Sequence, residues 1–310
     1  MSNKPLRKRL KNWLIYQFIR GLIWTVRRLP RPVALWLFRN LGLLAFRLIR
    51  EAREKTLRHL RMAFGDQRRE EEIYQLAKQV FRQLGLNAVE AMRMPNLLKA
   101  GLHKHIRFIG KEHLDRAYQR GKGVVCLTGH IGCWELFGAF IASHYPLKVV
   151  GAALYDPRLD AILLTERERA GYQSLPRDAS GTRRILRWLK QGGLLGILID
   201  QDTRVDGEFV DFFGRPAYTP AGPVVIAERT GAPLVPMAIY MNNDGTHTVE
   251  VRPEIELQNT GDARADRLAN VAQCSKAIEA FIREHPAQWV WMHERWKTQA
   301  SNETSASLQK

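Results

Sequence analysis

The chain has 310 residues, 45% of them hydrophobic, which is enough for one domain with a sizeable core and an appendage but short for two average domains. Lysine and arginine number 48 against 31 acidic residues, and the formal net charge of +17 favours a phosphate-bearing partner such as nucleic acid, phospholipid headgroups or a phosphorylated substrate. The three cysteines have no C-x-x-C spacing and no paired histidines nearby, so they indicate neither a disulfide framework nor a zinc site and favour a reducing cytosol.

The first 49 residues combine basic clusters with apolar, aromatic runs. The run at 13–26 follows a lysine- and arginine-rich start that includes Lys4, and no small-residue cleavage site comes after it, so we expect no secretory signal. It is shorter than the ~20 apolar residues of a spanning helix, although a tilted span with snorkelling arginines is an alternative. The run at 33–49 predicts an amphipathic helix in the headgroup region. We therefore expect residues 1–49 to bind an anionic membrane, the alternative being a buried helical hairpin.

Residues 50–98 are charged, with apolar positions at helical spacing, which predicts helices packed on a core. Beyond residue 106, short apolar runs bounded by glycine alternate with helical stretches. This alternation predicts an α/β layered domain over 50–298 with its reactive residues on loops at the strand ends. The small polar tail, 299–310, is expected to be disordered. The predicted strands are 123–127, 148–152, 193–199 and 233–240 with a strand pair within 246–253, and the predicted helices are 134–144, 183–190, 221–230 and 266–284.

The most informative segment is 128–135, T-G-H-I-G-C-W-E, between an apolar strand and an apolar helix. It places His130 at the strand end and Glu135 about one turn into the helix. Histidine titrates near neutrality and can take a proton from a hydroxyl, and a carboxylate near its other ring nitrogen fixes the tautomer. The spacing H-x-x-x-x-E therefore indicates a general base and its orienting partner. By itself the pattern is weak, because a histidine in a glycine-flanked loop is more often structural.

This segment resembles the H-x-x-x-x-D/E box of glycerolipid-type acyltransferases. Its wider setting, T-G-H-x-G-x-W-E, is similar to the late acyltransferases of bacterial lipid A biosynthesis, the lauroyl and myristoyl transferases. Those usually have asparagine where this chain has Cys133. Further blocks that resemble the same family are D-Q-D at 200–202, D-F-F-G at 211–214 running to T-P-A-G at 219–222, and W-M-H-E-R-W-K-T at 291–298.

The resemblance implies a glycerolipid acyltransferase-like α/β fold and a fatty acyl donor held as a thioester on acyl carrier protein. It also implies a phosphorylated glucosamine disaccharide glycolipid as acceptor and the cytoplasmic face of the bacterial inner membrane. The thioester is already activated, so we expect direct transfer with no cofactor and no metal. His130 would act as general base, Glu135 would orient it, and backbone amides or a basic side chain would stabilise the oxyanion. Acyl-coenzyme A as donor, with a lysophospholipid or another glycolipid as acceptor, is the alternative.

Other polar residues are weaker candidates. Arg167 matches an arginine that precedes glycine by four residues in the family and is expected to bind a phosphate, the alternative being a basic surface residue. Asp200 and Asp202 follow an apolar strand, where ligands gather in such sheets, so we expect them near the substrate. The helical cations within 183–190 are read first as a solvated basic face, with phosphate binding as the alternative. An acyl intermediate on Cys133 is disfavoured because nothing in the pattern orients the thiol.

Other functions find less support. The chain has no G-x-S-x-G, Walker A or G-x-G-x-x-G sequence, which disfavours an α/β-hydrolase and a nucleotide-binding protein. A nucleic-acid-binding protein is supported by the charge alone, because no recognition helix or aromatic, glycine-rich strand motif is present, and we expect no nucleic-acid partner. Trp289 and Trp291 alternate like one face of a strand, which predicts a packing role.

Overall fold

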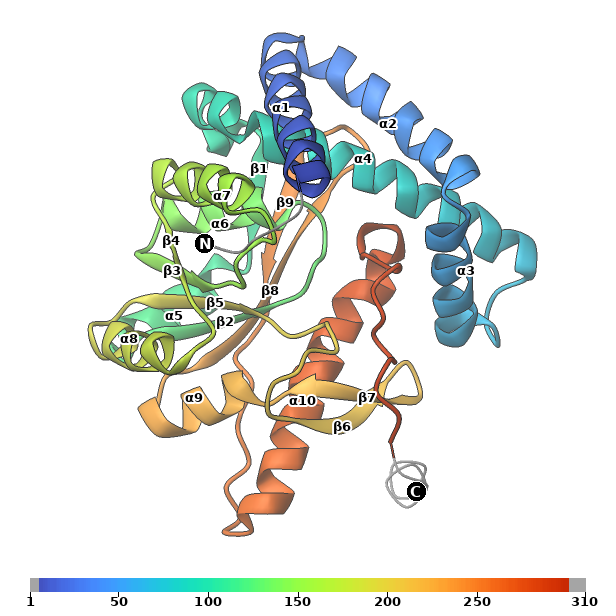
Figure 1. Ribbon diagram of the computed structural model, residues 1–310. Coiled ribbons are helices and arrows are strands. Elements are labelled where there is room, and N and C mark those ends of the chain that lie inside the picture. Colours follow the sequence, from blue (N-terminus) through green and yellow to red (C-terminus); the bar gives the residue numbers. More distant parts are fainter. Residues whose placement is uncertain (1–5, 301–310) are drawn as a thin grey trace.

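A seven-stranded mixed sheet forms the centre of the molecule (Figure 1). The computed structural model describes residues 6–300, so Lys4 and residues 301–310 of the tail that we expected to be disordered lie outside the described part. The strand order is β1-β9-β8-β2-β5-β3-β4, with every neighbouring pair parallel except β8 and β9. The α/β layered fold predicted from the strand and helix alternation is therefore confirmed. The strands are β1 (Ile106–Ile109), β2 (Val124–Thr128), β3 (Leu147–Val150), β4 (Gln173–Leu175), β5 (Leu194–Leu198), β8 (Leu234–Met241) and β9 (His247–Val251).

The central strand β2 explains why helices cover both faces of this sheet. All five of its residues are buried. Side chains alternate along a strand, so Val125 and Leu127 enter one core with α8, α9 and α10, while Val124 and Cys126 enter another with α5 and α6. The helices of these layers, with α7 on the side of α6, are α5 (Lys111–Gln119), α6 (Trp134–Ala142), α7 (Pro157–Arg169), α8 (Ala179–Lys190), α9 (Gly222–Thr230) and α10 (Ala263–Glu284).

Several elements differ from the sequence prediction. The segment 246–253 holds the single strand β9 instead of a strand pair, because β9 pairs with β8 and β1. Trp289 and Trp291 follow a short turn of 3₁₀ helix, η2 (Pro286–Gln288), outside any named strand. A separate hairpin of β6 (Gly207–Phe212) and β7 (Arg215–Pro220) was not predicted. Its two-residue turn, Phe213 at φ 57° and Gly214 at φ 72°, has the geometry of a tight hairpin, but phenylalanine rarely adopts a positive φ and so gives no turn signal.

The N-terminal helices pack on the rest of the molecule through a long helix. Arg31 forms an ion pair of 2.5 Å with Glu90, whose side chain is fully buried, and Arg93 donates a hydrogen bond of 2.6 Å to the backbone oxygen of Val26. These contacts join α1 (Leu6–Arg28) and α2 (Arg31–Leu48) to α4 (Glu70–Ala100), and α3 (Arg50–Phe64) follows α2 directly. Losing α1 and α2 would therefore leave Glu90 buried without its arginine partner.

The outer faces of α1 and α2 carry large apolar side chains in contact with solvent. Phe18 is 69% exposed, Trp24 59% and Trp36 61%, and Trp13, Leu14, Leu41, Leu44 and Leu48 are exposed as well. No described helix is by itself long and apolar enough to cross a bilayer, and only α2 and α3 taken together, with a 90° bend between them, meet that requirement. Membrane association of residues 1–49 stays a prediction.

Candidate active site

His130 lies in the loop between β2 and α6, and glycine shapes this loop. Gly132 has φ of 57°, and a Cβ atom there would lie 2.3 Å from the backbone oxygen of Ile239 in β8. The N–H of Gly132 donates to the backbone oxygen of Gln288, which ties the loop to the C-terminal segment. Only glycine fits such a close approach. The loop thus holds His130 just beyond the end of β2, with 19% of its side chain exposed.

Asp200 is the partner of this histidine. Nδ1 of His130 donates to Oδ1 of Asp200 at 2.8 Å, the main-chain N–H of His130 donates to Oδ2 at 2.7 Å, and Nε1 of Trp289 donates to the same Oδ2 at 2.7 Å. Burial alone would raise the pKa of Asp200, but the interaction with His130 and these hydrogen bonds hold that pKa well below its usual value. Because an ionised carboxylate only accepts hydrogen bonds, Nδ1 carries the proton and the lone pair of Nε2 is available as a base.

The register of the sheet brings the two residues together. Thr128 of β2 pairs with Leu198 of β5 in a parallel ladder. His130 and Asp200 each lie two residues beyond this pair, so both sit where the carboxyl ends of neighbouring strands meet. The same edge receives Trp289 from the C-terminal segment, whose isolated bridge to Ile131 holds it there. Trp289 therefore has a polar contact in addition to the packing role that we predicted.

Two further side chains surround Nε2 of His130. The Gln201 amide nitrogen lies 3.2 Å from Nε2 of His130 and 2.8 Å from Nε2 of His293. Burial, together with the proximity of His130, lowers the pKa of His293 to about 4. His293 is therefore neutral near pH 7 and accepts from the amide. The site pairs one basic nitrogen with one amide donor, and the ring of Trp134 borders it at 5.0 Å from His130.

Glu135 does not orient His130, which corrects the prediction from the H-x-x-x-x-E spacing. The guanidinium of Arg167 binds the Glu135 carboxylate in a bidentate manner, with Nε donating to Oε2 at 2.9 Å and Nη2 donating to Oε1 at 2.5 Å. The hydroxyl of Tyr172 donates to Oε2 at 2.9 Å. The side chain of Glu135 thus reaches from α6 toward α7 and β4, whereas the imidazole reaches toward β5. Spacing along the chain could not reveal this, because α6 begins at residue 134 and turns Glu135 away from the sheet edge.

The other predicted site residues have different surroundings. Arg167 is 14% exposed, and besides Glu135 it contacts the hydroxyl of Ser174 at 2.8 Å. Burial lowers the pKa of Arg167, but the hydrogen bond and charge of Glu135 outweigh it and raise that pKa. Asp202 accepts from the N–H of Thr298 at 2.6 Å and from its hydroxyl at 3.0 Å, which fastens the C-terminal segment beside the site. Asp200, expected near the substrate, is fully buried behind His130.

Cys133 is buried on α6's side of the loop, and burial raises the pKa of its thiol far above the usual value. A thiol that stays protonated near neutral pH is a poor nucleophile. The described residues that could together hold a metal ion are Glu250, Glu284 and His285, and Arg252 forms ion pairs with both of these carboxylates.

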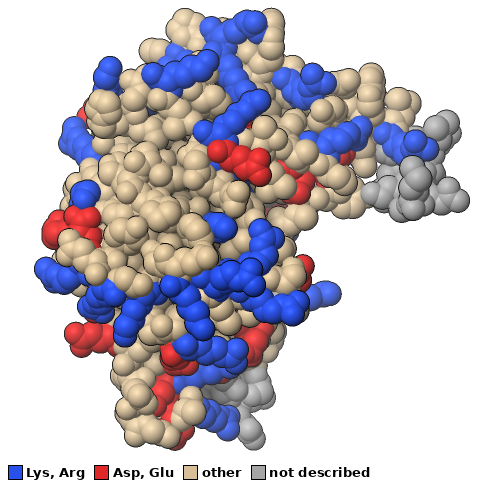
Figure 2. Space-filling model, turned by 90° about the vertical axis from the view of Figure 1, so that its left-hand side faces the viewer, with Lys and Arg blue, Asp and Glu red and all other residues tan. Residues whose placement is uncertain are grey.

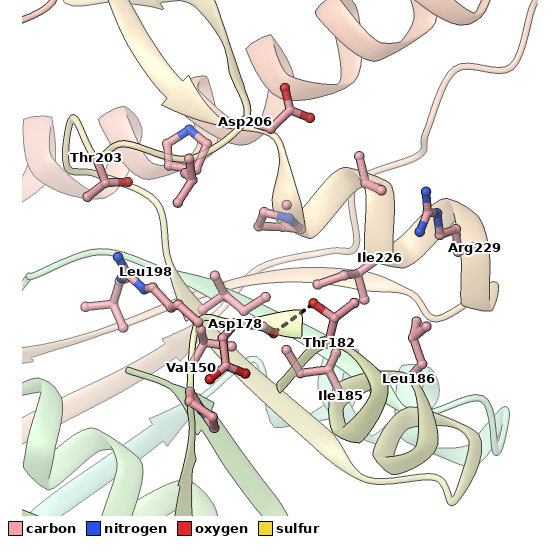
Figure 3. Close-up of a pocket in the computed structure, with 18 residues that line it drawn as sticks. Val150, Asp178, Thr182, Ile185, Leu186, Leu198, Thr203, Asp206, Ile226 and Arg229 are labelled. Atoms are coloured by element: carbon pink, nitrogen blue, oxygen red, sulfur yellow. Dashed lines mark hydrogen bonds between the residues drawn. The ribbon is translucent and has the colours of Figure 1, made fainter. Parts of the chain in front are cut away.

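A cavity of about 440 Å³ lies between the sheet, α8 and α9 (Figure 3). Its apolar wall includes Val150, Ile185, Leu198 and Ile226. Thr203 lines the cavity and lies across it from α8 in Figure 3. It is three residues after Asp200, so the cavity borders the segment after β5 that carries Asp200 and Gln201. The volume falls in the range of about 300–1,000 Å³ that is typical of small-molecule sites.

Gln201 and His293 lie in blocks that resemble the family, but the sequence pattern indicated no role for either residue. Gln201 follows the apolar run 194–199, and His293 follows the apolar run 289–292. Both residues lie far from His130 in the sequence. The only signal was the presence of polar residues in three separate blocks. The tertiary structure brings one side chain from each block together around Nε2 of His130.

Comparisons with known proteins identify the family of this chain. The family model described as bacterial lipid A biosynthesis acyltransferase matches residues 1–298. The chain is 25% identical to the lipid A biosynthesis palmitoleoyltransferase of Escherichia coli over 94% of both chains, and 25% identical to the lauroyltransferase of the same organism over 92% of both. It is also 29% identical to the phosphatidylinositol mannoside acyltransferase of Mycolicibacterium smegmatis over 71% of both chains. The chain belongs to the bacterial lipid A biosynthesis acyltransferase family, and it is an acyltransferase.

Proposed function

We propose that this enzyme transfers a fatty acyl chain from a thioester on acyl carrier protein to a hydroxyl of a phosphorylated lipid A precursor, at the cytoplasmic face of the bacterial inner membrane. One observation carries the proposal. The side chain of His130 is partly exposed, while the buried carboxylate of Asp200 holds ring nitrogen Nδ1 and leaves Nε2 as the basic nitrogen. This is the arrangement of a general base for an alcohol, and the family match supports acyl transfer as its chemistry.

The reaction would proceed by direct attack. Nε2 of His130 takes the proton of the acceptor hydroxyl as its oxygen bonds to the thioester carbonyl carbon, and negative charge develops on the carbonyl oxygen. Asp200 stabilises the imidazolium. Collapse of the tetrahedral intermediate breaks the carbon–sulfur bond, and the imidazolium returns the proton to the departing thiolate. Once Nε2 of His130 has taken the proton, it no longer accepts from the Gln201 amide 3.2 Å away, and we assign the released N–H of this amide as the side-chain donor to the oxyanion.

The cavity between α8 and α9 fits the acyl chain of the donor. The wall of this cavity is mainly apolar, and its lining includes Thr203, which is three residues after Asp200 in the chain. A chain lying there would pack on Val150, Ile185 and Ile226, and the depth of the cavity would select its length. The exposed aromatic side chains of α1 and α2, such as Trp24 and Trp36, would rest on the anionic membrane that holds the acceptor.

A second acceptor class has support of its own. The mycobacterial relative acts, by its name, on phosphatidylinositol mannoside, and its identity of 29% exceeds the 25% of the Escherichia coli lipid A enzymes, although over less of the chain. Acyl transfer to a different glycolipid, from acyl carrier protein or coenzyme A, is therefore the alternative function.

Mass spectrometry of lipid A, followed by assays of the purified enzyme, tests which of the two glycolipids is the acceptor. Lipid A would be analysed from cells that have the protein, lack it, or carry His130→Ala. We expect one acyl chain fewer in the second and third. Purified enzyme would then be given lipid A precursor or phosphatidylinositol mannoside with acyl-carrier and acyl-coenzyme A donors. Unchanged lipid A in cells, together with turnover of the mannoside alone, would replace the lipid A proposal with the alternative.

A further inference from the structure

Helix α8 carries an exposed cluster of positive charge, here called the α8 basic face. It consists of Arg177, Arg183, Arg184, Arg187 and Lys190, all of them exposed. The stretch 177–190 has one acidic residue, Asp178, whose carboxylate is occupied in capping the helix through the N–H of Gly181 at 2.8 Å. Within the described part of the chain, none of the five cations forms an ion pair with a carboxylate.

Several cations on other exposed helices are paired with an acidic residue of the same helix. On α3, Arg50 pairs with Glu54 and Lys55 with Glu51, four residues apart, and on α10 Arg283 pairs with Glu279 in the same way. Helix α8 lacks acidic residues at these spacings. The cations of α8 are therefore not neutralised by acidic residues of the same helix.

The same helix borders the cavity. Ile185 and Leu189 are buried against the core, and Thr182, Ile185 and Leu186 line the cavity wall. Arg177 belongs to both features, since it lies in the cavity lining and on the basic face. A partner bound to the basic face would thus sit beside this cavity.

The position of α8 favours a soluble partner over a membrane. In Figure 1, α8 lies at the lower left, far from α1 and α2 at the top, whose outer faces carry the exposed aromatic side chains. Figure 2 looks onto the side that carries α7 and α8 and shows a band of Lys and Arg side chains across it, below the middle. With α1 and α2 on a bilayer, α8 would lie away from the headgroups.

We propose that the α8 basic face is the docking surface for the acidic carrier protein that delivers the acyl thioester. This inference rests on the proposed function, because it takes a protein-bound thioester as the donor. Complementary charge speeds association and fixes the orientation of the partner, here so that the prosthetic arm lies beside the cavity.

Charge reversal on α8 tests the proposal. The variant Arg183→Glu/Arg187→Glu would be compared with Arg264→Glu/Lys276→Glu, which reverses two exposed cations on α10 and changes the formal charge equally. Each would be assayed with acyl carrier protein thioester and with acyl-pantetheine, which has the thioester but no protein. We expect the α8 variant to show a KM for the carrier-bound donor raised by roughly tenfold and a weaker salt dependence. Its kcat and its turnover of acyl-pantetheine should match those of the α10 control.

Melting temperatures show whether each variant is folded. The milder variant Arg183→Gln/Arg187→Gln removes the charge without reversing it, and we expect it to raise the KM for the carrier-bound donor by less. An unchanged KM for the carrier-bound donor in the α8 variant would overturn the docking surface while leaving the proposed function standing. Loss of binding to anionic vesicles by that variant, with its donor KM unchanged, would assign the face to lipid. Wild-type enzyme that uses acyl-coenzyme A but not the carrier-bound thioester would overturn the proposed donor and this inference together.

Discussion

The carboxylate of Asp200 binds His130 twice, accepting from its main-chain N–H and from ring Nδ1, although 70 residues separate the two. One group therefore fixes both the loop and the imidazole. Because the indole of Trp289 holds the same carboxylate at 2.7 Å, Asp200 cannot turn away without breaking three contacts. This relationship leads to the first of five predictions.

Replacing His130 by alanine should lower kcat by about 10²–10⁴-fold, as expected for loss of a general base. Asp200→Asn should lower kcat by a similar factor, because an amide can donate to Nδ1 and favour the wrong tautomer. The double variant should be scarcely worse than either single one, since the two act as a unit. Steady-state kinetics with matched melting temperatures measures this. Full turnover by folded His130→Ala protein would refute the mechanism.

Breaking the pair of Glu135 and Arg167 should mainly destabilise the fold. Each side chain is 14% exposed, and removing one partner leaves a buried charge, which costs about 3–5 kcal/mol. Arg167→Lys should recover only part of this, because an ammonium lacks the planar fork. Glu135→Gln/Arg167→Met, which removes both charges, should melt well above Arg167→Ala. If the double variant regains stability but keeps a raised KM for a phosphorylated substrate, Arg167 also binds phosphate as the sequence suggested.

His293 should make the enzyme less stable in acid. Its pKa is about 4 in the folded protein against the ordinary 6.5, so the unfolded chain binds the proton more readily. The contribution of neutral His293 to the free energy of unfolding is fully present above about pH 6.5. It is lost as the pH falls toward 4, which lowers the free energy of unfolding by about 3 kcal/mol in all. Denaturant unfolding between pH 4 and 7.5 would show the slope. His293→Asn, which can still accept from Gln201, should flatten it, and an equally steep slope in that variant would place the titrating group elsewhere.

Cys133 should be dispensable as a nucleophile. Burial raises the pKa of its thiol, so little thiolate exists near neutral pH. Cys133→Ala should retain substantial activity, and folded wild-type protein should react slowly with thiol reagents at this position. Peptide mapping after incubation with the acyl donor is the direct check, and a kinetically competent acyl group on Cys133 would reverse this assignment.

The exposed aromatics of α1 should drive membrane binding. Changing Phe18 and Trp24 to serine should release the protein from anionic vesicles, because these side chains are 69% and 59% exposed and pack little within the fold. Vesicle cosedimentation with unchanged melting temperature measures this. Deleting residues 1–49 is a poorer test, since it also removes Arg31 from the buried Glu90. Serine variants that sediment as the wild type does would place the membrane contact elsewhere.

Much of the fold was readable from local patterns. A strand buried on both faces needs a continuous apolar run, and 193–199 and 233–240 contain β5 and nearly all of β8 for that reason. The hairpin of β6 and β7 was not predicted, because its turn has Phe213 at a positive φ in place of a typical turn residue. Its strands also mix polar with apolar residues.

For the active site, local sequence was enough to predict that His130 follows a buried strand in a glycine-shaped loop, because the strand, the glycines and the histidine are contiguous in the chain. Local spacing also pointed to Glu135 as the partner of His130. The fold contradicts this prediction, since the parallel register of Thr128 with Leu198 sets His130 beside Asp200. Contacts between neighbouring strands depend on the order of the sheet, which spacing along one segment does not encode. The helix that carries Glu135 meanwhile turns this carboxylate toward Arg167.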